Sequence, residues 1–214
     1  SAQLELDPFQ RLIAAVDFGA THVSVAICTL DVRILAASER ELSITEGPEV
    51  ALAVMAEEVR SLLHSIGHTA EDVGAVGIGL PGPVEYSTGK PAKPPIMPGW
   101  DAFDVPERVK RDFAHVAVLV DNDVNLMALG ERHVAFPDVE NMIFLKVATG
   151  IGSGIIAGGE LQRGAQGTAG DIGHVQLTGG ADIQCRCGYT GCLEAVASVP
   201  AVLSEINGGG PALT

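Results

Sequence analysis

The feature that most restricts how this chain can fold is a group of three cysteines within eight residues, a short distance after a histidine. Cys185, Cys187 and Cys192 follow His174, and glycines stand between the last two cysteines. Three thiolates and one imidazole form a typical closed tetrahedral zinc site, and glycines allow the sharp turns that bring such ligands together. With four protein ligands and no place for water, the predicted zinc ion is structural.

The composition indicates an ordered, acidic protein. Hydrophobic residues make up 47% and charged residues 19% of the chain, and the formal net charge is −14. The few Lys and Arg residues are scattered, so we expect no direct nucleic-acid contact by this segment. The apolar runs are too short to span a membrane and the start lacks a basic, apolar leader, so we expect a cytoplasmic protein with no membrane association. In that reducing compartment, the isolated Cys28 is expected to be a small buried hydrophobe.

The expected order of elements is three strands, a helix and further strands. The predicted strands cover residues 12–17, 23–28, 34–39, 73–80, 116–120 and 141–147. Apolar positions at helical spacing predict an amphipathic helix over 47–66, and 150–156 is predicted to be a glycine-rich hairpin. This order suits the RNase H-like half of the actin-type fold. We therefore divide the chain into a leader at 1–11, a first lobe at 12–139 and a partial second lobe at 140–214.

Two turns rich in glycine and hydroxyl residues are candidate phosphate-binding sites. Asp17, Gly19 and Thr21 lie on a turn between two predicted strands, where the backbone can come close to a phosphate. Asp17 would then hold Mg²⁺ through water, although a strand that ends in Asp and a glycine turn is also common structure. The second turn contains Thr149, Gly150 and Gly152. Two such turns on separate lobes could clamp one nucleotide such as ATP.

A third polar run lies between a predicted strand and the helix-like stretch 126–131. It contains Asn122, Asp123 and Asn125. A carboxylate near a helix N-terminus is held ionised and can accept the proton of a hydroxyl that attacks a phosphoryl group. Asp123 is therefore the candidate catalytic base. The alternative is an Asn or Asp that caps the helix, and the two roles can coexist on neighbouring residues.

From Ile13 to Glu194 these motifs resemble, in the same order, those of the ROK (repressor, open reading frame, kinase) family. The pattern Cys-x-Cys-Gly-x-x-Gly-Cys-x-Glu matches at every fixed position. The resemblance implies an α/β fold of the actin-like ATPase type with two lobes, here C-terminally truncated, that binds a sugar or amino sugar and forms a homodimer. The positions that it implies for sugar hydroxyls are Gly82, Asn122, Asp123, Asp171, His174 and Glu194.

Three departures from the family pattern bear on function. Asp171 stands where the family's Glu-x-Gly-His motif has Glu, and Ala20 and His22 replace the glycine and lysine that are usual in its kinases. Kinase domains of the family also continue well beyond Thr214.

The segment before the first strand resembles the linker that joins a winged helix-turn-helix to the sugar domain in the family's regulators. We therefore predict the effector-binding domain of a ROK transcriptional regulator, which would reach DNA through a missing N-terminal winged helix-turn-helix. The alternative is an ATP-dependent hexose or N-acylhexosamine kinase, which Asp123 favours because a regulator needs no base there. A scaffold that binds no sugar is a third hypothesis.

Overall fold

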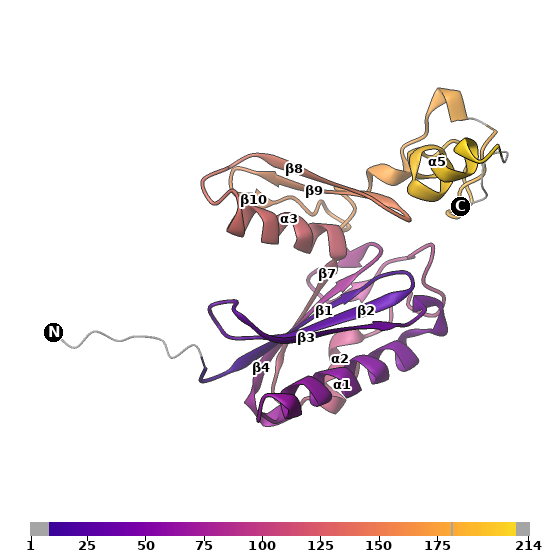
Figure 1. The fold of residues 1–214 in the computed structure, drawn as a ribbon. Helices are drawn as coiled ribbons and strands as arrows, with labels where there is room; N and C mark the ends of the chain where they lie inside the picture. Colours follow the sequence, from indigo (N-terminus) through magenta and orange to yellow (C-terminus); the bar gives the residue numbers. More distant parts are fainter. Residues whose placement is uncertain (1–8, 181, 209–214) are drawn as a thin grey trace.

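The first lobe is built on a five-stranded mixed sheet (Figure 1). The computed structural model describes residues 9–180 and 182–208, so most of the predicted leader lies outside the described residues. The strands are β1 (Leu12–Phe18), β2 (His22–Cys28), β3 (Ile34–Glu41), β4 (Val73–Leu80) and β7 (Ala117–Asn122). They lie in the order β3-β2-β1-β4-β7, where β2 is antiparallel to both neighbours and β4 is parallel to both. This order confirms the predicted RNase H-like sheet.

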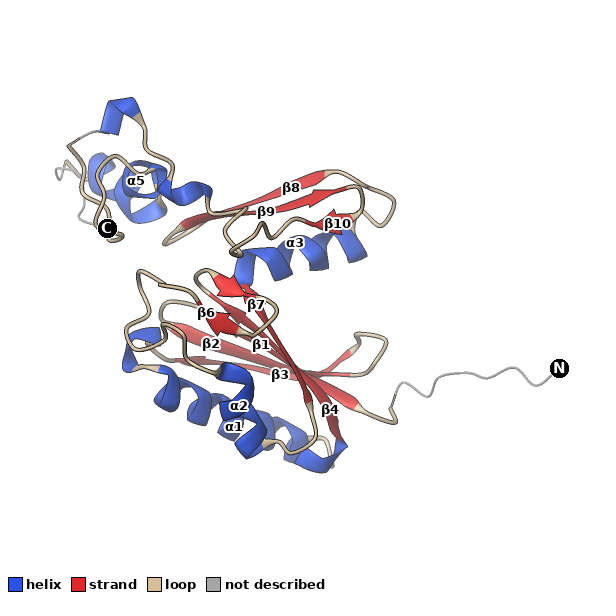
Figure 2. Ribbon diagram, turned by 180° about the vertical axis from the view of Figure 1, so that it is seen from behind, coloured by secondary structure: helices blue, strands red, loops and turns tan. Residues whose placement is uncertain are grey.

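Two helices, α1 (Pro48–Ser65) and α2 (Val105–Asp112), cover one face of this sheet (Figure 2). Helix α1 agrees with the helix predicted from periodicity, and its apolar stripe enters the main core together with alternate residues of β1. Helix α2 was not predicted, because most of its side chains are charged and only Val105 and Val109 among its apolar residues are buried. Its start is fixed by Asp104, whose carboxylate accepts a hydrogen bond from the Glu107 N–H.

Strand β7 runs directly into helix α3 (Asp123–Val134), which begins earlier than the helix-like stretch in the sequence. The strand extends two residues beyond the predicted 116–120, so Asp121 and Asn122 belong to regular structure. No loop separates the two elements. The polar run at 121–125 is therefore held by a strand on one side and a helix on the other.

The second lobe contains a three-stranded antiparallel sheet that packs on α3 (Figure 1). Its strands are β8 (Met142–Val147), β9 (Ile151–Ala157) and β10 (Glu160–Leu161). The predicted hairpin at 150–156 is mostly β9 itself, because the reversal occurs at 148–150, where Val147 pairs with Ile151. A Cβ on Gly154 would lie 2.4 Å from that of Ala128, so this glycine allows sheet and helix to touch. The lobe boundary at 139/140 remains a prediction, and α3 packs with the second sheet.

Short elements complete both lobes. They are η1 (Ile44–Glu46), η2 (Ala70–Asp72), β5 (Val84–Glu85), β6 (Lys90–Pro91), η3 (Ile172–His174), η4 (Thr178–Gly180), α4 (Leu193–Ala197) and α5 (Val199–Ile206). Among the described residues, no helix combines the length and apolar character that crossing a membrane requires.

Trp100 anchors the long connection between β4 and α2. Its side chain is fully buried, and its Nε1–H donates to the Ile44 carbonyl at 3.2 Å. The indole ring also meets Phe18 and Phe103 edge to face, with ring centroids 6.0 and 6.3 Å away. The only tryptophan of the chain thus ties this connection to the core of the first lobe.

We expect Trp100→Ala to lower the free energy of unfolding by about 3–5 kcal/mol, because it leaves a cavity in a packed core. Phe136→Ala is the control, since Phe136 is 48% exposed and its removal should change stability by no more than about 0.5 kcal/mol. Urea unfolding followed by circular dichroism measures both values. Equal losses in the two variants would show that Trp100 is not an anchor.

Candidate functional site

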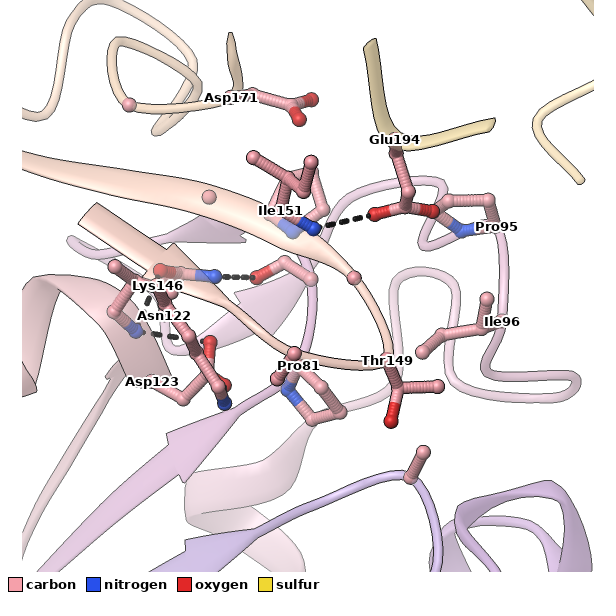
Figure 3. A pocket seen from close by; sticks show the side chains of 18 of the residues that line it. Pro81, Pro95, Ile96, Asn122, Asp123, Lys146, Thr149, Ile151, Asp171 and Glu194 are labelled. Atoms are coloured by element: carbon pink, nitrogen blue, oxygen red, sulfur yellow. Dashed lines mark hydrogen bonds and ion pairs between the residues drawn. The ribbon is translucent and has the colours of Figure 1, made fainter. Parts of the chain in front are cut away.

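A cavity of about 290 Å³ lies between the two lobes, close to the lower end of the range of about 300–1,000 Å³ that is usual for small-molecule sites. Its first-lobe wall comes from the turn at 19–22 and the loops at 81–83 and 95–96. The opposite wall comes from β8, the following turn, the loop before η3, and α4. Figure 3 shows side chains from both lobes around this space.

The cavity brings together nearly all residues that the sequence singled out for ligand binding. Every predicted sugar-binding position lines it: Gly82, Asn122, Asp123, Asp171, His174 and Glu194. Most of the predicted phosphate-binding positions line it as well: Gly19, Thr21, Thr149, Gly150 and Gly152. Segments far apart in the chain therefore meet at one place.

Asp17 is the exception, because it does not line this cavity. It lies among the partly exposed positions of β1 and, with Asp123, lines a second hollow. Burial raises the pKa of the Asp17 carboxyl, and the negative charge of Asp123 raises it further. A Cβ on Gly79 would lie 3.0 Å from Asp17 Oδ1, so the glycine makes room for the carboxyl behind the cavity wall.

Asn122 caps helix α3, as one of the two hypotheses predicted. Its Oδ1 accepts hydrogen bonds from the N–H groups of Val124 and Asn125 at 2.9 and 3.2 Å. Its Nδ2 donates to the Gly82 carbonyl at 3.1 Å and so fixes the loop after β4. An amide nitrogen carries two hydrogens, so one donor is left for a ligand in the cavity.

Asp123 is paired with a lysine that sequence reasoning missed. Lys146 Nζ donates to Asp123 Oδ2 at 2.6 Å, and the Val124 N–H donates to Asp123 Oδ1 at 2.9 Å (Figure 3). The Asp123 side chain is only 5% exposed. The one signal in the sequence was a single lysine within the otherwise apolar strand β8.

A second ion pair, also missed, joins the end of β7 to the loop after β10. Arg163 Nε donates to Asp121 Oδ2 at 2.8 Å, and the guanidinium lies 3.7 Å from the centre of the Tyr86 ring. Asp121 Oδ1 accepts from Asn125 Nδ2 at 2.9 Å. A Cβ on Gly167 would lie 2.2 Å from the Val84 carbonyl oxygen, so this loop passes directly against β5.

Glu194 enters the cavity from the start of α4. Its Oε2 accepts the Ile151 N–H at 2.9 Å (Figure 3). Gly150 leaves space for this contact, because a Cβ there would lie 2.6 Å from the same oxygen. Arg186, which comes from the cysteine loop, also lines the cavity, and its Nη2 lies 3.5 Å from the Thr149 carbonyl. The other Glu194 oxygen is left for a ligand.

The four predicted metal ligands converge on one point. The donor atoms of His174, Cys185, Cys187 and Cys192 all lie within 4.8 Å of one another. The Cys187 and Cys192 sulfurs are 3.6 Å apart, and Cys185 Sγ lies 3.7 Å from His174 Nδ1. Metal–sulfur bonds of about 2.3 Å in a tetrahedron place ligands about 3.8 Å apart. The cluster therefore has the donors and spacing to hold a metal ion.

The fold around this cluster depends on its turns and has little apolar support. Gly188 and Gly191 have positive φ values of 92° and 77°, as the predicted sharp turns require. The local core of buried residues contains only Cys185, Cys192 and Ala195 within the described part of the chain. Burial raises the pKa of the Cys192 thiol to about 12, and the neighbouring thiols contribute to the shift. A bound cation would reverse this preference for the neutral thiol.

The sheet order, the second lobe and the cavity between the two lobes show the fold of the actin-like ATPase and sugar kinase superfamily. A glucokinase of the ROK family from Streptomyces griseus, solved with glucose and AMPPNP, superimposes with a TM-score of 0.74 and 28% identity. The match covers 92% of this chain and 62% of that one.

The chain belongs to the ROK family, which it matches over residues 13–212. It is 32% identical to a glucokinase of Halalkalibacterium halodurans over 90% of this chain and 58% of the relative. It is 31% identical to a putative xylose repressor of a Caldicellulosiruptor species over 95% of this chain and 51% of the relative. The chain thus spans little more than half the length of these relatives, which include both kinases and repressors.

We expect Arg163→Met to lower the free energy of unfolding by about 3 kcal/mol, the lower end of the range for breaking a buried pair, because Asn125 still donates to Asp121. Arg40→Met is the matched control. The Arg40 side chain is 47% exposed and pairs with Glu58, and such surface pairs contribute about 0–1 kcal/mol. Urea unfolding measures both, and similar losses would contradict a fastening role for Arg163.

Proposed function

We propose that the cavity binds a monosaccharide or amino sugar and that the chain is the effector-binding domain of a ROK transcriptional regulator. The observation that carries this proposal is the meeting of six predicted sugar-binding positions on one cavity between two lobes. Hydroxyl groups need both acceptors and donors. Asp123, Asp171 and Glu194 supply carboxylate acceptors, and Asn122 supplies an amide donor.

The turn at 19–22, which is the predicted phosphate-binding turn of the first lobe, favours a sensor over a kinase. The His22 ring lies over Gly19, so that a Cβ there would be 2.2 Å from His22 Cε1. The imidazole thus covers the bare backbone that a phosphate would otherwise approach. Together with Ala20 in the same turn, this departure weakens the case for tight binding of a nucleotide.

The second candidate function is an ATP-dependent hexose or N-acylhexosamine kinase. Asp123, at the start of α3, faces the cavity near the turn of Thr149, Gly150 and Gly152. In a kinase, ATP and Mg²⁺ would supply the phosphoryl group and the charge that stabilises its transfer, and Asp123 would accept the proton of the sugar hydroxyl. The sequence similarity to a glucokinase supports this second candidate.

A regulator of this family would act as a cytoplasmic homodimer and contact DNA through an N-terminal winged helix-turn-helix. The cytoplasm suits cysteines that serve as metal ligands, because its reducing conditions keep thiols free. The acidic charge of the chain fits the assignment of DNA contact to another segment.

We propose that the ion held by His174, Cys185, Cys187 and Cys192 is a structural zinc. Three sulfurs and one nitrogen fill a tetrahedron and leave no position for water or substrate. The zinc would position a cavity residue indirectly, because its ligand Cys192 immediately precedes the helix that carries Glu194.

Screening the full-length protein by thermal shift with glucose, xylose, N-acetylglucosamine and N-acetylmannosamine tests the sugar site. One sugar is expected to raise Tm, without sugar-dependent ADP release from Mg-ATP. Glu194→Gln should weaken binding of that sugar about tenfold, because a charged acceptor becomes neutral. Glu57→Gln, a substitution at a side chain that is 71% exposed, is the control and should bind like the wild type.

The same assay separates the two candidate functions. Sugar-dependent ADP release that Asp123→Asn abolishes, with the sugar-induced Tm shift retained, would establish the kinase and overturn the sensor. No Tm shift with any sugar of the panel would contradict both.

For the metal, we expect about one zinc per chain in the native protein, lost in Cys187→Ser together with a marked fall in Tm. Cys28→Ala is the control, because Cys28 is buried in β2 and takes no part in the cluster. Elemental analysis of the purified variants measures the metal. Well-folded native protein without zinc would contradict this proposal.

A further inference from the structure

Strand β8 places Lys146 on the side of the sheet that packs against α3. Its side chains alternate between partly buried and exposed positions. The partly buried ones are Met142, Phe144 and Lys146, and the exposed ones are Ile143, Leu145 and Val147. The covered side is where the sheet meets α3. An ammonium placed there loses water and needs an acceptor, which Asp123 supplies.

The ion pair with Lys146 leaves Asp123 able to accept hydrogen bonds but badly placed to accept a proton. Oδ2 takes the Lys146 ammonium at 2.6 Å and Oδ1 takes the Val124 N–H at 2.9 Å. Each oxygen keeps a second lone pair, so a sugar hydroxyl can still donate to either one. A proton that settled on Oδ2 would replace the charge-assisted bond to Lys146, which is among the strong hydrogen bonds of proteins.

We propose that Lys146 is the specificity-determining residue that lets this cleft bind a sugar hydroxyl without phosphorylating it. The inference rests on the proposed sugar-binding function. Transfer from a nucleoside triphosphate forms a bond between the hydroxyl oxygen and the terminal phosphorus and breaks the bond from that phosphorus to the bridging oxygen. The hydroxyl proton must pass to the carboxylate. Here that carboxylate is committed to an ammonium, so Lys146 acts through Asp123 as a positioning residue.

The ion pair of Lys146 and Asp123 also acts on a third charged side chain, Asp17. Asp17 lines a second hollow together with Asp123, and its raised pKa reflects burial first and the negative charge of Asp123 second. Lys146 and His22 act in the opposite direction on the same carboxyl. Lys146 therefore acts on two carboxylates, the buried Asp123 and the partly exposed Asp17, and its removal would change what both can do.

Three variants of the full-length protein test the inference. Lys146→Met removes the charge at similar length, Lys146→Gln removes the charge but keeps a hydrogen-bond donor for Asp123, and Lys146→Arg keeps the charge as the matched control. Each is assayed for Tm shift with the four sugars above and for sugar-dependent ADP release from Mg-ATP. Circular dichroism and zinc content verify folding, and the Gln variant carries the test where the Met variant does not fold.

We expect the wild type and Lys146→Arg to bind the sugar and to release ADP only at a slow background rate. Lys146→Met or Lys146→Gln should bind it and release ADP about 10²-fold faster than the wild type, the lower end of the contribution of a general base. The gain should vanish when Asp123→Asn is added, which a merely structural role of Lys146 would not predict.

Two results would overturn the inference while leaving the sugar site intact. One is a charge-removing variant that binds the sugar as the wild type does and gains no turnover. The other is a wild type that turns over and loses activity in Lys146→Met, which would make Lys146 a catalytic residue. Absence of sugar binding by the wild type is a separate result, seen before any variant is made, and it removes the proposed function together with this inference.

Discussion

The arrangement of the two lobes depends on a pair of buried carboxylates where β7 meets α3. Asp121 and Asp123 have side chains that are 3% and 5% exposed. Each is paired with one cation that comes from beyond α3 in the chain, Arg163 for the first and Lys146 for the second. A buried charge without its partner is costly, so neither pair separates without a penalty. The cleft is therefore held by electrostatic contacts at its base as well as by apolar packing.

The junction of β7 and α3 also explains how the polar run at 121–125 can both stabilise the fold and face the cavity. Asn122 caps α3 and holds the Gly82 carbonyl, so its amide positions a helix and a loop at once. These contacts consume most of its hydrogen-bonding capacity and fix the direction of what remains. Glu194 is used in a similar way, because one of its oxygens holds the Ile151 N–H. Side chains tied down on one side can present the other side to a ligand with little loss of entropy.

Local patterns predicted much of this architecture, and long-range pairing accounts for what they missed. The cysteine spacing was sufficient to predict the metal cluster, because its ligands lie on one short loop and on a nearby histidine. Lys146 and Arg163 meet partners 23 and 42 residues away, and no spacing rule connects such positions. Helix α2 was missed because it is short and mostly charged, and its apolar stripe consists only of Val105 and Val109. That Asp17 would not line the cavity was open to prediction from period-two alternation, since it lies between the buried Val16 and Phe18.

In the proposed function, recognition of a sugar and catalysis of phosphoryl transfer place opposite requirements on the Asp123 carboxylate. To bind a hydroxyl, Asp123 needs only to accept a hydrogen bond. To assist phosphoryl transfer, it must change its protonation state as the hydroxyl attacks. A lysine ammonium 2.6 Å away favours the first demand and opposes the second. Under the proposed function, a single position on β8 can therefore separate a sensor from a kinase without altering the rest of the cavity wall.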